Sequence, residues 1–141
     1  MKRLNPSAVS APIGLYSHAS QVHGSSRTVF VAGQVGIRPD GTLAGDDFRS
    51  QMVQTLENMR SILADAQMTL DDVTKFTTYL VHDADVEVFY NTRAELFPHL
   101  FRHPQYPPNT LLIVRRLVRP ELLIEIEGTA ATDGQPTGTP H

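Results

Sequence analysis

The sequence contains no cysteine. This absence excludes disulfides, thiolate nucleophiles and metal sites built on cysteine. The chain also lacks a large excess of charge of either sign, because 12 basic and 15 acidic residues leave a formal net charge of −3. Such a chain has no electrostatic reason to bind nucleic acid or an anionic membrane. With 40% hydrophobic and 19% charged residues, it has the composition of an ordinary globular domain.

Long hydrophobic runs are missing as well. No apolar stretch approaches the roughly 20 residues that a membrane-spanning helix needs. The first fourteen residues, MKRLNPSAVSAPIG, carry two basic residues but no apolar segment after them, so we expect no secretory signal. A cytoplasmic location is the resulting expectation. No glycine-rich stretch ends in Gly-Lys-Ser or Gly-Lys-Thr, which argues against a phosphate-binding loop.

The hydrophobic spacing that is present predicts strands and helices in alternation. Strands are expected at Arg27–Gly33, Val73–Val81, Thr110–Leu117 and Glu121–Ala131, and helices from about Asp46 to Gln67 and from about Asp85 to Phe101. The last two strands are expected close together, joined by a tight turn. This order predicts an α/β sandwich whose two helices cover one face of the sheet. Residues 1–132 then form a single domain, and the polar residues 133–141 form a disordered tail.

One predicted strand poses a question. In Leu122–Gly128, LLIEIEG, strand alternation places Glu125 and Glu127 on one face, with Ile124 and Ile126 on the other. A solvated sheet face explains two acids on such a strand. The alternative is a pocket or a subunit interface, because two helices cannot cover both faces of this sheet. The alternation alone leaves both explanations open.

Other polar residues give weaker signals. His99 and His103 are spaced as two metal ligands on a helix would be, but no acid lies between them and a proline follows. Surface histidines are the simpler interpretation, and we predict no metal site. Tyr16 follows a proline and a glycine, so a loop presents its hydroxyl. Asn91 lies on the second predicted helix, where a lone amide is usually a surface residue.

Five segments, taken together and in order, resemble the Rid family, the reactive-intermediate deaminases also called YjgF-type proteins. They are APIGLYSHA (11–19), VFVAGQVG (29–36), QTLENMRSILADA (54–66), DDVTKFTTYLVHDADVEVFYN (71–91) and RPELLIEIEGTA (119–130). The resemblance implies a chorismate-mutase-like fold with a mixed sheet. It also implies a homotrimer in which the sheets form a central barrel and the sites lie in clefts between subunits.

The family resemblance also implies an activity: hydrolysis of 2-imino and 2-enamino acids to a 2-keto acid and ammonia, with no cofactor. By this resemblance Glu125 would hold the attacking water and Tyr16 and Asn91 would bound the pocket. The backbone near Gly33 would contact the substrate carboxylate. Glu127 is expected to be a structural acid. An imine carbon is already electrophilic, so water attack needs only positioning and proton transfer.

The chain departs from the family at one position. Active members carry an arginine at the start of the penultimate strand, which grips the substrate carboxylate in a bidentate pair. Counting back from Glu125, that place is occupied by Thr110. Arg116 lies too far along the chain to replace it, and nothing in the sequence brings Arg102 or Arg38 to the pocket. Thr110 is therefore the expected substrate-binding residue there.

Two hypotheses follow from this departure. In the first, the protein is a Rid-type deaminase with altered substrate specificity. In the second, it keeps the trimer and its clefts but binds a metabolite or a protein without turnover. Cleavage of RNA, which has been attached to some relatives, is disfavoured by the charge of −3 and by the lack of a basic and aromatic surface.

Overall fold

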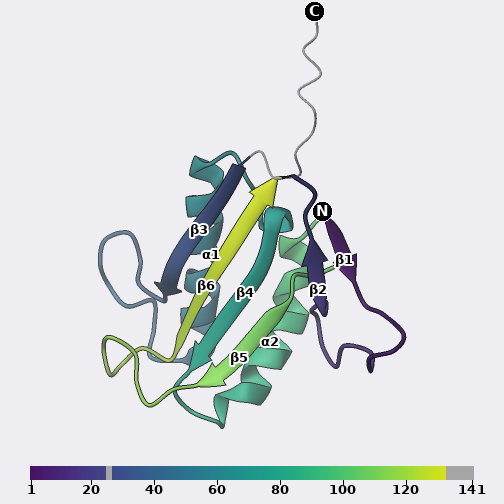
Figure 1. Ribbon diagram of the computed structural model, residues 1–141. Helices are drawn as coiled ribbons and strands as arrows, with labels where there is room; N and C mark the ends of the chain where they lie inside the picture. Colours follow the sequence, from purple (N-terminus) through teal and green to yellow (C-terminus); the bar gives the residue numbers. More distant parts are fainter. Residues whose placement is uncertain (25–26, 133–141) are drawn as a thin grey trace, which may run out of the picture.

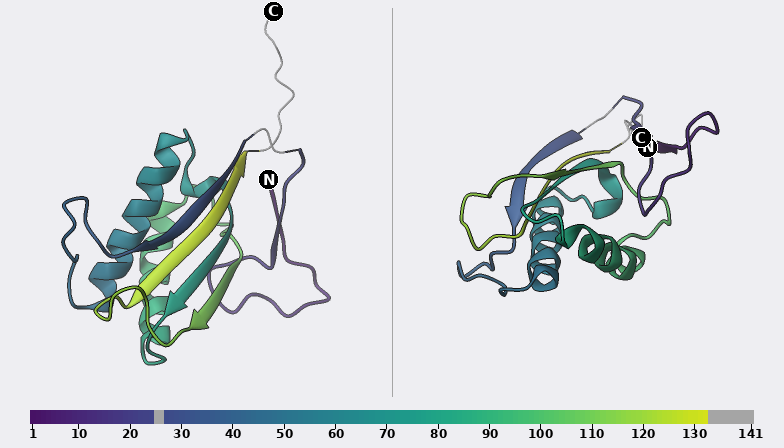
Figure 2. Two further views of the ribbon diagram at one scale, coloured as in Figure 1. Left: turned by 60° about the vertical axis from the view of Figure 1, so that its left-hand side comes forward. Right: turned by 90° about the horizontal axis from the view of Figure 1, so that it is seen from below.

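A computed structural model describes residues 1–24 and 27–132. Its elements are the strands β1 (Lys2–Leu4), β2 (Ala19–Gln21), β3 (Arg27–Val35), β4 (Val73–Leu80), β5 (Asn109–Ile113) and β6 (Ile124–Thr132), the helices α1 (Phe48–Asp65) and α2 (Asp85–Leu100), and a short 3₁₀ turn (Leu70–Asp72). Both helices lie on one face of the larger sheet, as predicted, and the other face is left open (Figures 1 and 2). The predicted tail, residues 133–141, lies outside the described residues.

The larger sheet has the strand order β3-β6-β4-β5. β6 enters between β3 and β4 and is antiparallel to both, whereas β4 and β5 are parallel. The sheet is therefore mixed, and α2 is the helical crossover that a parallel pair requires. This topology makes the last strand of the chain a central strand. The two acids of β6 consequently lie in the middle of the open sheet face and not at its edge.

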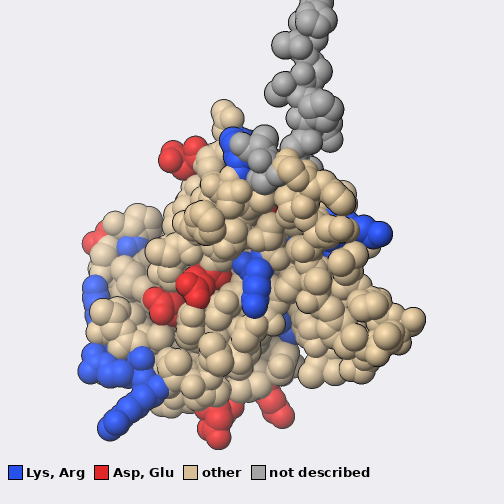
Figure 3. All heavy atoms as spheres, viewed as in Figure 1, with Lys and Arg blue, Asp and Glu red and all other residues tan. Residues whose placement is uncertain are grey.

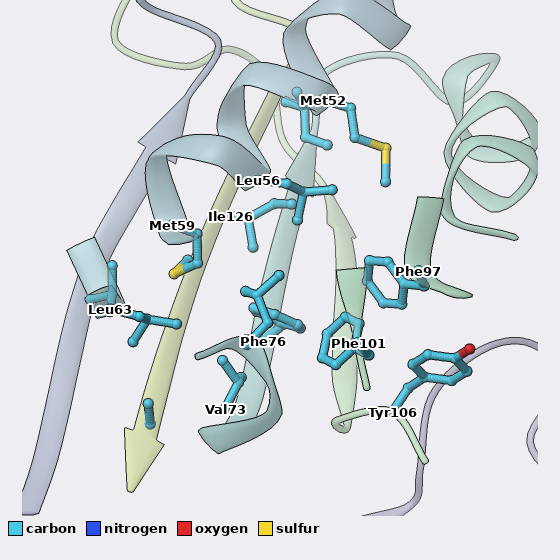
Figure 4. Close-up of a cluster of buried hydrophobic side chains, with 14 of the residues drawn as sticks. Met52, Leu56, Met59, Leu63, Val73, Phe76, Phe97, Phe101, Tyr106 and Ile126 are labelled. Atoms are coloured by element: carbon cyan, nitrogen blue, oxygen red, sulfur yellow. The ribbon is translucent and has the colours of Figure 1, made fainter. Parts of the chain in front are cut away.

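The core lies between the helices and the sheet (Figure 4). The side chains that α1 buries recur at helical spacing: Phe48, Met52, Leu56, Met59 and Leu63 are each at most 5% exposed. Across from them, β6 contributes Ile124 and Ile126, which are also buried. The side chain of Asp47 caps α1 by accepting a hydrogen bond from the backbone N–H of Ser50. The predicted amphipathic helix and the predicted alternation of β6 are both confirmed.

Two expectations about neighbouring strands were wrong. β5 ends at Ile113, earlier than predicted, and it pairs with β4 and not with the last strand. A loop over residues 114–123, and no tight turn, joins β5 to β6, because the chain has to cross β4 to reach its place in the sheet. The hairpin of β1 and β2 was also missed. Strands of three residues are too short to produce a recognisable alternation.

Gln51 ties the first turn of α1 to the loop that leads into β6. Its side chain is completely buried. The amide nitrogen donates to the carbonyls of Gly45 and Glu121, each at 3.0 Å, and the amide oxygen accepts from the backbone N–H of Leu123 at 2.8 Å. One side chain thus satisfies three backbone groups that have left regular structure.

We expect Gln51→Leu to lower the free energy of unfolding by about 2 to 4 kcal/mol, because an apolar side chain leaves buried backbone groups without partners. Urea denaturation measures the loss. The matched control is Gln54→Leu, in the next turn of the same helix. Within the described part of the chain its side chain bonds only to Asn58, so this variant should cost less than about 1 kcal/mol. Equal losses for the two variants would contradict the role assigned to Gln51.

Candidate functional site

The open face of the sheet carries an acidic pair at its centre. Glu125 and Glu127 of β6 are half-buried on this face, while Ile124 and Ile126 point to the helices. On β4, Tyr79 is in register with Glu125 and Thr77 is in register with Glu127. Figure 3 shows acidic atoms gathered over the middle of this face, close to a basic side chain. The pair therefore lies on an exposed surface of one chain, and not in an enclosed pocket.

Glu125 packs against the backbone of β3 at Gly33. The pairing of β3 with β6 shifts register between Val31 and Gln34, so Gly33 lies in a bulge. A Cβ atom at Gly33 would come within 2.5 Å of Oε1 of Glu125. Only glycine leaves room for the carboxylate here. The structure thus brings together two of the predicted site residues.

The two acids have different electrostatic environments. The hydroxyl of Tyr79 donates to Oε1 of Glu127 at 2.5 Å, and this bond raises the pKa of Tyr79. Burial, and then the negative charge of Glu127, raise the pKa of Glu125. Among the described residues the Glu125 carboxylate has no hydrogen-bond partner. Glu127 is therefore held in place by a donor, and Glu125 keeps its proton to a higher pH than an ordinary glutamate does.

Tyr16 and Thr110 share a groove at the other side of the same face. The groove encloses about 490 Å³ and lies between the loop that precedes β2 and the start of β5. Thr110 is exposed in it, and the hydroxyl of Tyr16 accepts a long bond, 3.4 Å, from the backbone N–H of Ile13. The hydroxyl of Ser17 anchors the loop that precedes β2 by donating a hydrogen bond to the backbone carbonyl of Tyr106 at 2.6 Å. This hydrogen bond holds Tyr16 at the groove.

Within one chain, the contact pair of Gly33 and Glu125 is separate from the groove pair of Tyr16 and Thr110. Thr110 is in register with Thr77, which is in register with Glu127. Two strand spacings and two residues along the strand then separate the Cα atoms of Thr110 and Glu125, which is about 12 Å. Asn91 is exposed on α2, on the side of the sheet away from the acids, and belongs to neither pair.

Sequence reasoning missed Arg93. This arginine is only 2% exposed and lies on the inner side of α2. Its guanidinium carbon is 5.0 Å from the ring centre of Phe89, 5.1 Å from that of Tyr90 and 5.8 Å from that of Tyr16. Desolvation lowers its pKa, against the opposing effect of the two tyrosines. The signal was the spacing 89, 93 and 97, which puts an arginine on the buried stripe between two phenylalanines.

None of the helices within residues 1–24 and 27–132 is long and apolar enough to cross a membrane. Within the same residues, no cluster of three or more His, Cys, Asp or Glu side chains is arranged to hold a metal ion.

The contact at Gly33 predicts a measurable change at Glu125. Gly33→Ala should push the carboxylate outward into water and so lower the pKa of Glu125 toward its ordinary value, because burial is the main cause of the shift. The free energy of unfolding should change by less than about 1 kcal/mol, since the obstructing atoms belong to a flexible side chain. Carboxyl NMR titration measures the pKa.

Gly128→Ala, on β6 itself, is the control for this variant. A Cβ atom there would meet the backbone oxygen of Lys75 and the ring of Phe76, not Glu125. It should destabilise the fold without moving the pKa of Glu125. An unchanged pKa in Gly33→Ala would show that the carboxylate does not depend on this glycine.

The fold and the acid-bearing open face define an α+β sandwich of a known class. The family model described as Endoribonuclease L-PSP matches residues 7–132. A RutC family protein of Pyrococcus horikoshii is 36% identical over 120 residues, which are 84% of this chain and 88% of that protein. A RutC family protein of Pyrococcus abyssi is 34% identical over 120 residues, 84% of this chain and 87% of that protein. The chain therefore belongs to the Endoribonuclease L-PSP family, the Rid or YjgF type of protein that the sequence predicted.

Solved structures agree with this assignment. The Rid family protein YyfB of Yersinia pestis superimposes with a TM-score of 0.80 at 32% identity, over 93% of this chain and 98% of that one. Escherichia coli TdcF, crystallised with bound serine, gives a TM-score of 0.69 at 25% identity, over 94% of this chain and all of that one. The fold predicted from the sequence is confirmed.

Proposed function

We propose that the protein is a cofactor-independent hydrolytic deaminase of reactive imine and enamine metabolites, with a substrate specificity altered from that of its relatives. One observation supports this most directly. Glu125 stands at the centre of the open sheet face, packed on Gly33, with a raised pKa and no partner among the described residues. A carboxylate whose pKa is raised accepts a proton more readily than an ordinary one and can return it.

In the proposed reaction Glu125 orients a water molecule toward the imine carbon. The water oxygen forms a bond to that carbon while Glu125 takes one proton of the water, and Glu125 then gives this proton to the nitrogen, which yields the carbinolamine. Glu125 next takes the hydroxyl proton of the carbinolamine and passes it to the amine, the carbon–nitrogen bond breaks, ammonia leaves, and the carbonyl of the keto product forms. An enamine substrate first gains a proton at its terminal carbon and loses one from its nitrogen to become the imine. Each step needs only proton transfer and positioning, so no cofactor is required.

We propose that the active form is a homotrimer whose sites lie between subunits. Support comes from the exposed position of the acid: Glu125 lies on the open sheet face of one chain, and its Cα atom is about 12 Å from that of the groove residue Thr110. A neighbour placed on the open face would bring its own groove to this acid. Phe30 and Leu112 lie on that face, 80% and 44% exposed, and would be buried by such contact.

In this proposal Tyr16, Thr110 and the backbone at Gly33 contact the substrate. That Asn91 bounds the pocket stays a prediction for the assembled oligomer. We propose a cytoplasmic location and small-molecule ligands, and no nucleic acid or membrane partner. TdcF, crystallised with bound serine, is a relative that takes a small amino acid.

A second function is favoured by one specific residue. Thr110 offers a single neutral donor where active relatives are expected to have a guanidinium. A trimeric module that binds a metabolite or a protein without turnover is consistent with this loss. It would retain the groove and the interface but release no product.

The decisive experiment generates 2-aminoacrylate in the assay, by dehydration of serine, and follows release of pyruvate and ammonia. The deaminase proposal predicts a rate above that of buffer which scales with protein concentration. A rate equal to that of buffer, with ligand-induced stabilisation by small carboxylates, would support the binding module instead. Light scattering tests the assembly: a mass equal to one chain would refute the intersubunit site.

A further inference from the structure

Arg93 is a buried cation without a counter-ion. Among the described residues no carboxylate forms an ion pair with it, and its Nη2 atom is buried with no hydrogen-bond acceptor. Three aromatic rings surround the guanidinium. Their negative faces offset part of the cost of burial, but a ring does not replace a directional acceptor. An uncompensated buried charge is strongly destabilising and is not kept by packing alone.

The guanidinium of Arg93 is next to a residue that lines the groove. Tyr16 lines the groove, and the centre of its ring lies 5.8 Å from the guanidinium carbon. Asn109 likewise lines both the groove and the small cavity beside Arg93. That cavity has a volume of only about 10 Å³, at the lower limit for one water molecule and too small for a carboxylate. An anionic partner for Arg93 therefore does not fit in this cavity, whereas the groove that Tyr16 and Asn109 line, at about 490 Å³, is large enough for a small carboxylate.

The loop over Arg93 is built for close approach. A Cβ atom at Gly14 would lie 2.5 Å from Nη2, so only glycine admits the guanidinium beneath the loop. The neighbouring Ile13 is 84% exposed and does not anchor the loop to the core. A ligand in the groove could reach the guanidinium only after the segment Gly14–Tyr16 moves.

We propose that Arg93 binds the carboxylate of the ligand in the groove of Tyr16 and Thr110, in place of the arginine absent at position 110. The inference rests on the proposed function for its substrate class, a small 2-imino or 2-keto acid. It moves the site of charge recognition from the start of β5 to the inner side of α2. The ligand then carries a carboxylate, and Thr110 is not a sign of lost binding.

Binding of pyruvate and of pyruvamide, its uncharged analogue of the same shape, tests the proposal by calorimetry without requiring turnover. Wild type should prefer pyruvate by at least about tenfold, since charge-assisted hydrogen bonds distinguish the two. Arg93→Met should reduce that preference to within about twofold and should not lower the melting temperature, because the buried charge is unpaired. Arg60→Met removes an exposed arginine paired with Glu57 and should retain the wild-type preference.

Each outcome decides the matter. A preference retained in Arg93→Met, or the lack of one in wild type, overturns the proposal. If Arg93→Met does not fold, Arg93→Gln supplies the same comparison with a polar side chain. The deaminase proposal fails separately, through the absence of pyruvate release from 2-aminoacrylate. If wild type releases no pyruvate from 2-aminoacrylate but prefers pyruvate to pyruvamide, and Arg93→Met abolishes this preference, catalysis is refuted and the anion site is supported.

Discussion

Glu125→Gln should reduce pyruvate and ammonia release from 2-aminoacrylate by at least about a hundredfold, because general acid–base catalysis contributes on the order of 10² to 10⁴ in rate. The amide has nearly the same shape as the carboxyl group, so it preserves packing against Gly33. It cannot take a proton from water. Single-turnover kinetics, with the substrate formed in place, measures the loss in the chemical step.

Although Glu125→Gln should lower activity, it should raise the stability of the protein at neutral pH. Burial and the charge of Glu127 raise the Glu125 pKa above its ordinary value of 4.5, so the native chain holds this proton to higher pH than the unfolded chain does. Stability is therefore lost as the pH rises through the window that begins near 4.5 and ends at the raised pKa. Glu125→Gln should remove this loss and stabilise the neutral-pH protein by less than about 1 kcal/mol, since water screens a half-exposed carboxylate.

Two further variants separate the acids. Glu127→Gln removes the neighbouring charge and should lower the Glu125 pKa, which shifts the acid limb of the pH–rate profile to lower pH. It should leave catalysis largely intact if Glu127 is the structural partner of Tyr79. Glu57→Gln, an exposed acid on α1, is the control for loss of a charge. Activity in Glu125→Gln equal to that of wild type would remove this residue from the mechanism.

Thr110→Arg should lower the KM for 2-aminoacrylate by about 10- to 1,000-fold, because a guanidinium can form two charge-assisted bonds to the carboxylate where threonine offers one neutral donor. The structure gives this variant room: Thr110 is exposed at the start of β5 in a groove of about 490 Å³. Steady-state kinetics and pyruvate binding measure the gain. Thr42→Arg adds the same charge at an exposed loop position and should leave both unchanged.

Combined with Arg93→Met, this variant becomes a rescue. If the ligand carboxylate lies in the groove, an arginine at position 110 should restore the preference for pyruvate over pyruvamide that Arg93→Met abolishes. An unchanged KM and no rescue would mean that Thr110 does not face the ligand. That result would leave the tests of Glu125 untouched.

The sequence by itself determined most of the architecture. The spacing of Phe48, Met52, Leu56, Met59 and Leu63 fixed the buried face of α1, because helical periodicity depends only on neighbours along the chain. The alternation in β6 assigned Glu125 and Glu127 to the open face for the same reason. The five sequence segments, in their order along the chain, were then enough to identify the family.

Only the tertiary structure decided which strands are neighbours and which side chains meet. The insertion of β6 between β3 and β4 places the acids centrally and separates β5 from β6, which the turn signals did not reveal. The Gly33 contact depends on a bulge in strand pairing, and the burial of Arg93 depends on the loop of Gly14 folding over α2. These contacts join residues that are far apart in sequence, so local propensity carries no information about them.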